Sequence, residues 1–303
     1  MVMYYSKMIN RLILTILCLL ASGFGSNAQY NPQYSQYMFN GLAINPAFAG
    51  SMEALNVSAL YRGSQLGNSV KGAPVTQTLA GDFQLRNPQL AIGMMIFNDQ
   101  IHTLRNTGAY FAYVFRVRVG EGKLSFGLQA GVEQQREANK NLILVHSDDP
   151  LFRSDVNKIF MLNVGAGTYY YTPKFFAGLS FPQISEINSG KLIFSPKLYG
   201  GTIFSTDKDL KIKPSTLVQY SGTGVLWDLN CNFLLMQERL ELGASWRNAG
   251  VFVAMVQFKY NNFTIGYAHD YAIGKPNAIN TTHEIMLRYD LNIRVNAMST
   301  LFL

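Results

Sequence analysis

The chain has 303 residues and a formal net charge of +7, but only 14% of its residues are charged, against roughly 25% in soluble domains. Its basic residues are scattered singly and form no cluster, which argues against a nucleic-acid partner. Aromatic residues reach 13%. Beyond residue 28 no uncharged apolar run approaches about 18 residues, so the sequence predicts no transmembrane helix.

Residues 1–28 have the pattern of a secretory signal peptide. Two basic residues precede the apolar run 12–21, and a small-residue cleavage site ends at Ala28. The run is shorter than the roughly 20 apolar residues that span a bilayer, which disfavours the alternative of a signal anchor. We therefore expect export, a mature chain that begins at Gln29, and one remaining cysteine, Cys231, without an internal disulfide.

The expected mature chain opens with QYNPQYSQYMFNGLAINPAFAGS, residues 29–51, which is rich in aromatic residues and has no charge. Pro32 and Pro46 bias the residues before them away from helix, and two glycines permit tight turns. The segment is too aromatic for a solvated tail and too polar for a core helix. It needs an interior surface against which to pack.

From residue 55 onward, apolar residues alternate with small or polar ones, the pattern of strands with two different faces. In LSFGLQAGVE, residues 124–133, every second residue is apolar. The same alternation occurs in residues 175–181, 225–235 and 283–291. Less regular segments begin near Leu55, Thr76, Leu90, Ala109, Phe160, Leu198, Ile212, Leu240, Phe252 and Phe263.

These segments predict an all-β protein, a transmembrane antiparallel up-and-down β-barrel of about fourteen strands. A soluble sandwich also alternates, but its outer face is charged, whereas the polar face here is mostly Gly, Ser, Thr, Asn and Gln. We expect residues 53–303 to form the barrel. We expect residues 29–52 to pack irregularly at its periplasmic mouth or inside it, where non-helical backbone is tolerated. A partly ordered periplasmic tail is the alternative.

Two irregular segments interrupt the strands, at residues 136–158 and 271–280. The first is the longest charged stretch and is expected outside the cell, because extracellular loops of such barrels are usually the longer ones. It is a predicted surface for a partner outside the cell. The candidate residues are Asp148, Asp149, Arg153 and Asp155.

No pattern points to catalysis, a cofactor or a metal. The sequence has no Gly-x-Ser-x-Gly, no cysteine pair and no phosphate-binding loop. His269 precedes Asp270 and His283 precedes Glu284, but neighbours in a strand point to opposite faces, so each pair is expected to divide across the wall.

Several charged residues fall on the predicted inward face. Ion pairing in the lumen is their favoured role, and a translocation path is the alternative. They are Arg62, Arg116, Arg247 and Arg288, with Glu133, Asp228, Glu241 and Glu284.

The stretch QYSQYMFNGLAINPAFAGS, residues 33–51, closely resembles the N-terminal hallmark of the PorP/SprF family, outer-membrane proteins of the type IX secretion system. The resemblance continues in order through LYRGSQ, GAPVTQTLAGDF, IGMMIFNDQI, LSFGLQAGV, LKIKPSTLVQY, LGASWRNAG, FTIGYAHDY and HEIMLRY. It implies an outer-membrane protein that binds peptidoglycan-linked periplasmic machinery and the C-terminal domain of an exported cargo, for example a large adhesin in gliding systems. Membrane lipid is the other expected partner.

The same resemblance implies that the opening segment meets the periplasmic machinery through its aromatic and amide side chains. The expected residues are Gln33, Tyr34, Gln36, Tyr37, Phe39, Asn40, Asn45 and Pro46. A passive outer-membrane channel or small-molecule transporter is the alternative function, because the fold alone does not separate the two.

Overall fold

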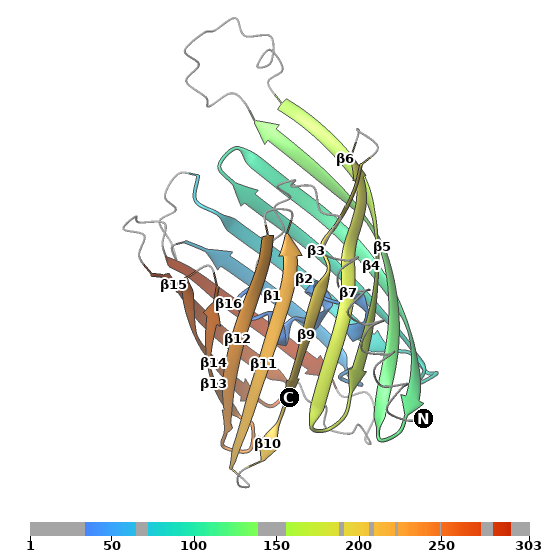
Figure 1. Ribbon diagram of the computed structural model, residues 1–303, viewed down its shortest axis with the longest axis vertical. Coiled ribbons are helices and arrows are strands. Elements are labelled where there is room, and N and C mark those ends of the chain that lie inside the picture. The colour runs from blue at the N-terminus through green and yellow to red at the C-terminus, as the bar shows by residue number, and fades with distance from the viewer. Residues whose placement is uncertain are drawn as a thin grey trace, which may run out of the picture.

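The structure, a computed structural model, is one antiparallel β-sheet that closes on itself as a barrel (Figure 1). None of the helices among the residues that it describes is long and apolar enough to cross a membrane. The described residues are 34–64, 72–138, 156–187, 191–205, 209–221, 224–248, 250–273 and 281–291.

Three short 3-10 helices precede the strands: η1 (Tyr37–Phe39), η2 (Gly41–Ala43) and η3 (Pro46–Phe48). The first strands are β1 (Leu55–Gly63), β2 (Val75–Gln84), β3 (Leu90–Ile101), β4 (Leu104–Val119), β5 (Gly122–Ala138), β6 (Val156–Tyr171), β7 (Phe175–Ile187) and β8 (Lys191–Phe194). The others are β9 (Lys197–Thr202), β10 (Phe204–Ser205), β11 (Leu210–Ser221), β12 (Gly224–Leu235), β13 (Leu240–Arg247), β14 (Val251–Tyr260), β15 (Phe263–Ala272) and β16 (Thr281–Leu291).

Two strands, β1 and β9, close the barrel. β1 pairs with both β2 and β16, and β9 pairs with both β7 and β11. β8 and β10 are short pieces on either side of β9 in the chain, pairing with β7 and β11 respectively. Pro196 lies in the break before β9, where its missing N–H cannot join a ladder. The described residues therefore occupy fourteen strand positions, which confirms the predicted barrel and its size.

Each predicted strand is present, but several are longer than expected. β4 begins at Leu104 and β6 at Val156, and β5 runs to Ala138. The expected loop 136–158 is correspondingly shorter, because Arg136 and Lys158 pair across β5 and β6. Residues 139–155, which include the candidate cargo residues, lie outside the described part of the chain.

The predicted alternation separates a lipid-facing wall from a polar lumen. On β5, Phe126, Leu128 and Val132 are exposed on the outer wall, whereas Ser125 and Glu133 are buried inside. On β16, Ile285 and Leu287 are likewise exposed, and their neighbours Glu284, Met286 and Arg288 are buried.

The two rims of the barrel differ. At the upper rim in Figure 1 lie the paired ends of β1 and β2, β5 and β6, and β15 and β16, which are separated in the sequence by residues 64–74, 139–155 and 273–280. At the lower rim, β4 joins β5 through residues 120–121 and β14 joins β15 through residues 261–262. Long loops at one end and short turns at the other are typical of outer-membrane barrels.

Cys231 is a free cysteine on β12 that tests the assignment of the outer wall. Its stripe includes the exposed Leu229 and Phe233, and its neighbours Asn230 and Asn232 are buried inside. Cys231→Arg should lower the free energy of unfolding by about 2 to 4 kcal/mol if the site lies near the bilayer midplane, and by less near an interface. Urea unfolding in lipid vesicles measures the change, and Cys231→Val is the matched apolar control.

The Cys231 thiol should also react slowly with a water-soluble maleimide in intact membranes. Rapid labelling of the unmodified protein would mean that β12 has the opposite register.

Candidate functional site

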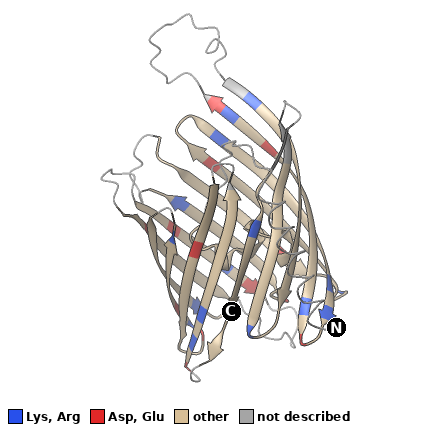
Figure 2. Ribbon diagram, in the orientation of Figure 1, with Lys and Arg blue, Asp and Glu red and all other residues tan. Residues whose placement is uncertain are grey.

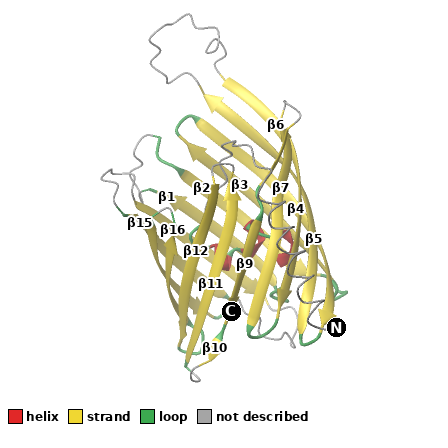
Figure 3. Ribbon diagram, in the orientation of Figure 1, coloured by secondary structure: helices red, strands yellow, loops and turns green. Residues whose placement is uncertain are grey.

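The opening segment lies inside the barrel. All residues from Tyr34 to Gly50 are buried, and Figure 3 shows their three short helices within the ring of strands. The segment reaches widely separated strands: the Tyr34 hydroxyl is 3.0 Å from the Thr78 hydroxyl on β2, and the Asn45 amide donates to the Tyr199 hydroxyl on β9 at 3.2 Å. The predicted packing inside the barrel is confirmed for residues 34–50, and the alternative of a periplasmic tail is wrong for them.

The carboxylate of Glu284 on β16 anchors the start of this segment. Its two oxygens accept hydrogen bonds from the backbone N–H groups of Ser35 and Gln36, each at 2.8 Å. The Gln36 side-chain amide donates to the Glu284 carbonyl at 3.2 Å. Glu284 is fully buried, so these charge-assisted bonds satisfy a carboxylate and two N–H groups that water does not reach.

A cluster of charges surrounds that anchor. Arg62 on β1 forms ion pairs with Asp270 on β15 at 2.6 Å and with Glu284 at 3.2 Å, and it also donates to the Ser35 hydroxyl. That hydroxyl donates in turn to Asp270 at 2.7 Å. Arg247 on β13 joins the cluster through Asp270, at 3.7 Å, and pairs with Asp228 on β12 at 2.8 Å. The cluster therefore links five wall strands, three of which contact Ser35 directly.

The other predicted lumen charges also form pairs or hydrogen bonds inside. Glu241 pairs with Lys213 at 2.7 Å, and Arg288 pairs with Asp290 at 3.0 Å. Arg116 donates to the Ala49 carbonyl at 3.0 Å, and Glu133 accepts from Tyr110. The favoured interpretation, ion pairing in the lumen, is thus confirmed for six of the eight residues, whereas Arg116 and Glu133 form hydrogen bonds to neutral groups.

Asn45 and Pro46 shape the middle of the segment. The Asn45 side chain accepts from the Ala47 N–H at 2.9 Å, which caps η3, and Pro46 takes the first helical position, where no N–H is needed. The Asn45 amide also donates to the Thr168 carbonyl on β6 at 2.8 Å.

The barrel wall is shaped to admit this backbone. A Cβ atom on Gly127 of β5 would lie 2.3 Å from the Ala47 nitrogen, and one on Gly167 of β6 would lie 2.0 Å from the Asn45 side-chain oxygen. Neither position tolerates a larger residue without moving the segment, so these glycines permit its close approach.

The predicted periplasmic contact residues of the segment, apart from Gln33, lie against the barrel's own wall. Tyr34, Gln36, Tyr37, Phe39, Asn40, Asn45 and Pro46 are all buried. Burial raises the pKa of both Tyr34 and Tyr37 above the ordinary value of 10.0. Gln33, like Asp148, Asp149, Arg153 and Asp155, lies outside the described residues. Partner binding by either set stays a prediction.

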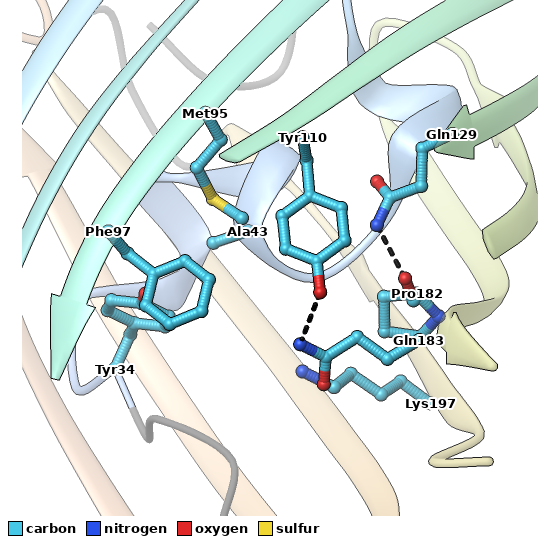
Figure 4. A pocket seen from close by; sticks show the side chains of 9 residues that line it. All are labelled: Tyr34, Ala43, Met95, Phe97, Tyr110, Gln129, Pro182, Gln183 and Lys197. Carbon is cyan, nitrogen blue, oxygen red and sulfur yellow. Dashed lines mark hydrogen bonds between the residues drawn. The ribbon is translucent and has the colours of Figure 1, made fainter. Parts of the chain in front are cut away.

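A small cavity remains beside the segment (Figure 4). It is lined by Tyr34, Ala43, Met95, Phe97, Tyr110, Gln129, Pro182, Gln183 and Lys197. Its volume is about 30 Å³, enough for roughly two water molecules. The Gln183 amide donates to the Tyr110 hydroxyl at 3.0 Å across this space.

Sequence reasoning missed Ser35 and Asp270 as partners of the anchor. The alternation in FTIGYAHDY does place Asp270 on the inward face, next to the predicted inward Glu284 in the neighbouring strand. No pattern in the segment marks Ser35 as their common partner, because that contact joins residues 235 positions apart.

The two histidine–acid pairs divide across the wall as predicted. Asp270 and Glu284 point into the lumen and are buried. His269 and His283 are partly exposed cross-strand neighbours, with their Nδ1 atoms 3.4 Å apart. Within the described part of the chain, no group of three or more His, Cys, Asp or Glu side chains is placed to hold a metal ion.

This geometry defines a class: a transmembrane β-barrel of the outer membrane whose lumen is occupied by the chain's own N-terminal segment. A family model described as type IX secretion system membrane protein PorP/SprF matches residues 26–289. The chain belongs to that family, and it is an outer-membrane component of type IX secretion.

Comparison with curated proteins gives no match. Among solved structures, the toluene transporter TbuX of Ralstonia pickettii is 12% identical, with a TM-score of 0.50, over 89% of this chain and 96% of that one. The outer membrane protein Omp33 of Acinetobacter baumannii is 11% identical, with a TM-score of 0.46, over 78% and 97%. A Pseudomonas aeruginosa FadL homologue is 9% identical, with a TM-score of 0.47, over 89% and 96%. At these identities the likeness concerns the fold alone.

Glu284→Gln tests the anchor. The substitution keeps the shape of the side chain but removes the charge that Ser35, Gln36 and Arg62 contact. Weakening the anchor by about 2 kcal/mol should make backbone amides of residues 34–40 exchange roughly 30-fold faster. Hydrogen exchange with mass spectrometry measures this in the purified full chain.

The matched control is Glu133→Gln. Glu133 is also a buried lumen carboxylate, but its hydrogen bonds go to wall residues such as Tyr110 and Asn106. Equal acceleration in both variants, or none in Glu284→Gln, contradicts the anchoring role.

Proposed function

We propose that this outer-membrane barrel binds periplasmic components of the type IX machinery at one rim and the C-terminal domain of an exported cargo at the other. The observation that carries the proposal is the occupied lumen in a member of a secretion family. A barrel whose interior holds its own segment offers its rims, rather than a pore, for recognition. An enzymatic role does not form part of the proposal, because neither the family nor the fold points to one.

The longer connections favour the upper rim as the extracellular one. The lower rim, where β1 begins and β16 ends, then faces the periplasm. The segment leaves the lumen there, and Glu53, just before β1, pairs with Lys123 at the start of β5. We assign the contact with peptidoglycan-linked machinery to this rim. The buried residues Tyr34 to Pro46 contribute by holding the segment in position.

Cargo recognition is assigned to the loop that joins β5 and β6. Strands repeat one pattern around the barrel, so specificity for one partner requires a part that does not repeat. Asp148, Asp149, Arg153 and Asp155 supply charges in that loop.

Exchanging residues 139–155 for the corresponding loop of a paralogue should change which proteins reach the cell surface. The measurement is a comparison of surface proteins by mass spectrometry at matched barrel levels. An exchange of the short upper turn 102–103, between β3 and β4, is the control and should leave the cargo unchanged. An unaltered cargo profile after the exchange of residues 139–155 means that this loop does not select the cargo.

A passive channel or small-molecule transporter is the competing function, and conductance separates the two. In planar bilayers the full chain should conduct little, because the segment fills the lumen beside a cavity of about 30 Å³. Deleting residues 34–50 should raise the single-channel conductance severalfold, provided that the variant still folds as a heat-modifiable barrel. High conductance in the unaltered protein would favour the channel.

A further inference from the structure

Three cations form a row on the outer wall near the upper rim. Arg105 on β4 lies directly opposite Arg136 on β5, and Arg136 lies directly opposite Lys158 on β6. Opposite residues on neighbouring antiparallel strands have Cβ atoms roughly 5 Å apart, so the row is about 10 Å long. All three side chains are exposed, and Figure 2 shows basic residues towards the upper ends of β5 and β6.

This basic row is not neutralised by the described part of the protein. Like charges placed directly opposite each other destabilise a sheet. Arg105 donates to the neutral Gln100 side chain at 3.1 Å, and neither Arg136 nor Lys158 forms an ion pair with a described residue. The nearby acids Glu133 and Glu137 alternate onto the opposite face of β5.

The surface below the row changes from polar to apolar. The next outward-facing row lies two residues along each strand towards the membrane centre. It consists of paired residues on neighbouring strands: Asn98, Thr107, Gln134 and Phe160. Two residues further down, the outer face carries Val132 and Leu162, and Phe160 and Leu162 are 73% and 80% exposed. These apolar side chains belong to the lipid-facing band.

The basic row stands at the depth of lipid headgroups. Arg136 is four residues beyond Val132 on the same strand. At about 3.3 Å per residue and a tilt of 35–45°, this places Arg136 roughly 10 Å above Val132, and Lys158 roughly 5 Å above Phe160. Phosphate groups of a bilayer lie at that level, outside the hydrocarbon core.

We propose that Arg105, Arg136 and Lys158 form a binding site for the phosphate-bearing headgroup of a membrane lipid. Arginine matches phosphate oxygens in two-point contacts, and lysine adds a compact charge. The lipid's acyl chains then lie along Phe160 and Leu162, on apolar surface continuous with the site. This continuity favours a lipid over a free phosphate ion. The site is independent of the secretion role, because it requires only that the barrel span a membrane.

The experiment uses the purified full chain in a neutral detergent, with lipid binding measured by native mass spectrometry. The probes are dioleoyl phosphatidic acid, dioleoyl phosphatidylcholine and inorganic phosphate. Phosphatidic acid should bind most tightly. The variant R105Q/R136Q/K158Q should bind it on the order of 100-fold more weakly, at about fivefold for each cation.

The matched control, R118Q/K174Q/R239Q, removes three exposed cations near the lower rim. It should retain at least half of the wild-type affinity, and heat-modifiable migration shows whether each variant keeps its barrel. Three results overturn the proposal: unchanged phosphatidic acid binding in the upper variant, an equal loss in the control, or inorganic phosphate binding as tightly as the lipid.

Discussion

The fold depends on one constraint: a backbone in the hydrocarbon core must satisfy its N–H and C=O groups without water. A β-sheet satisfies this constraint only when it has no free edge. Here the pairing of β1 with β16, and of β9 with both β7 and β11, closes the sheet. Eight strands leave an interior that side chains just fill, whereas fourteen enclose a wider one. The N-terminal segment occupies this wider interior.

The segment meets the same constraint by different means, because its irregular backbone forms no ladder. Wall side chains take the place of a neighbouring strand. Glu284 accepts from two N–H groups, Asp82 accepts from the Gly50 N–H at 2.7 Å, and the Ser180 hydroxyl donates to the Ile44 carbonyl at 2.5 Å. The inward polar residues are therefore partners for a specific backbone as well as a hydrated lining.

The lumen and the outer wall of the barrel therefore differ in their chemistry. Most of the described lumen charges form ion pairs with one another or hydrogen bonds to the segment, as with Arg62, Asp270 and Ser35. The outer wall is apolar and faces lipid. The exposed charges of Arg105, Arg136 and Lys158 lie instead on the outer wall near the upper rim.

The sequence by itself determined the strands, their two faces and the lumen charges. Alternation at period two is local and is imposed by lipid on one side and polar space on the other, so it is visible in the sequence before any strand pairing is known. The inward position of Glu284 also followed from this alternation. The sequence also indicated that residues 29–51 need an interior.

Only the tertiary structure decided which lumen groups meet. Glu284 contacts Ser35 across 249 positions of the chain, and Gly127 and Gly167 are small because Ala47 and Asn45 pass over them. Register across the sheet likewise aligned Arg105, Arg136 and Lys158, which lie far apart in the sequence. The physical reason is that alternation specifies the face of a residue but not its height or its neighbours, which depend on closure of the whole barrel.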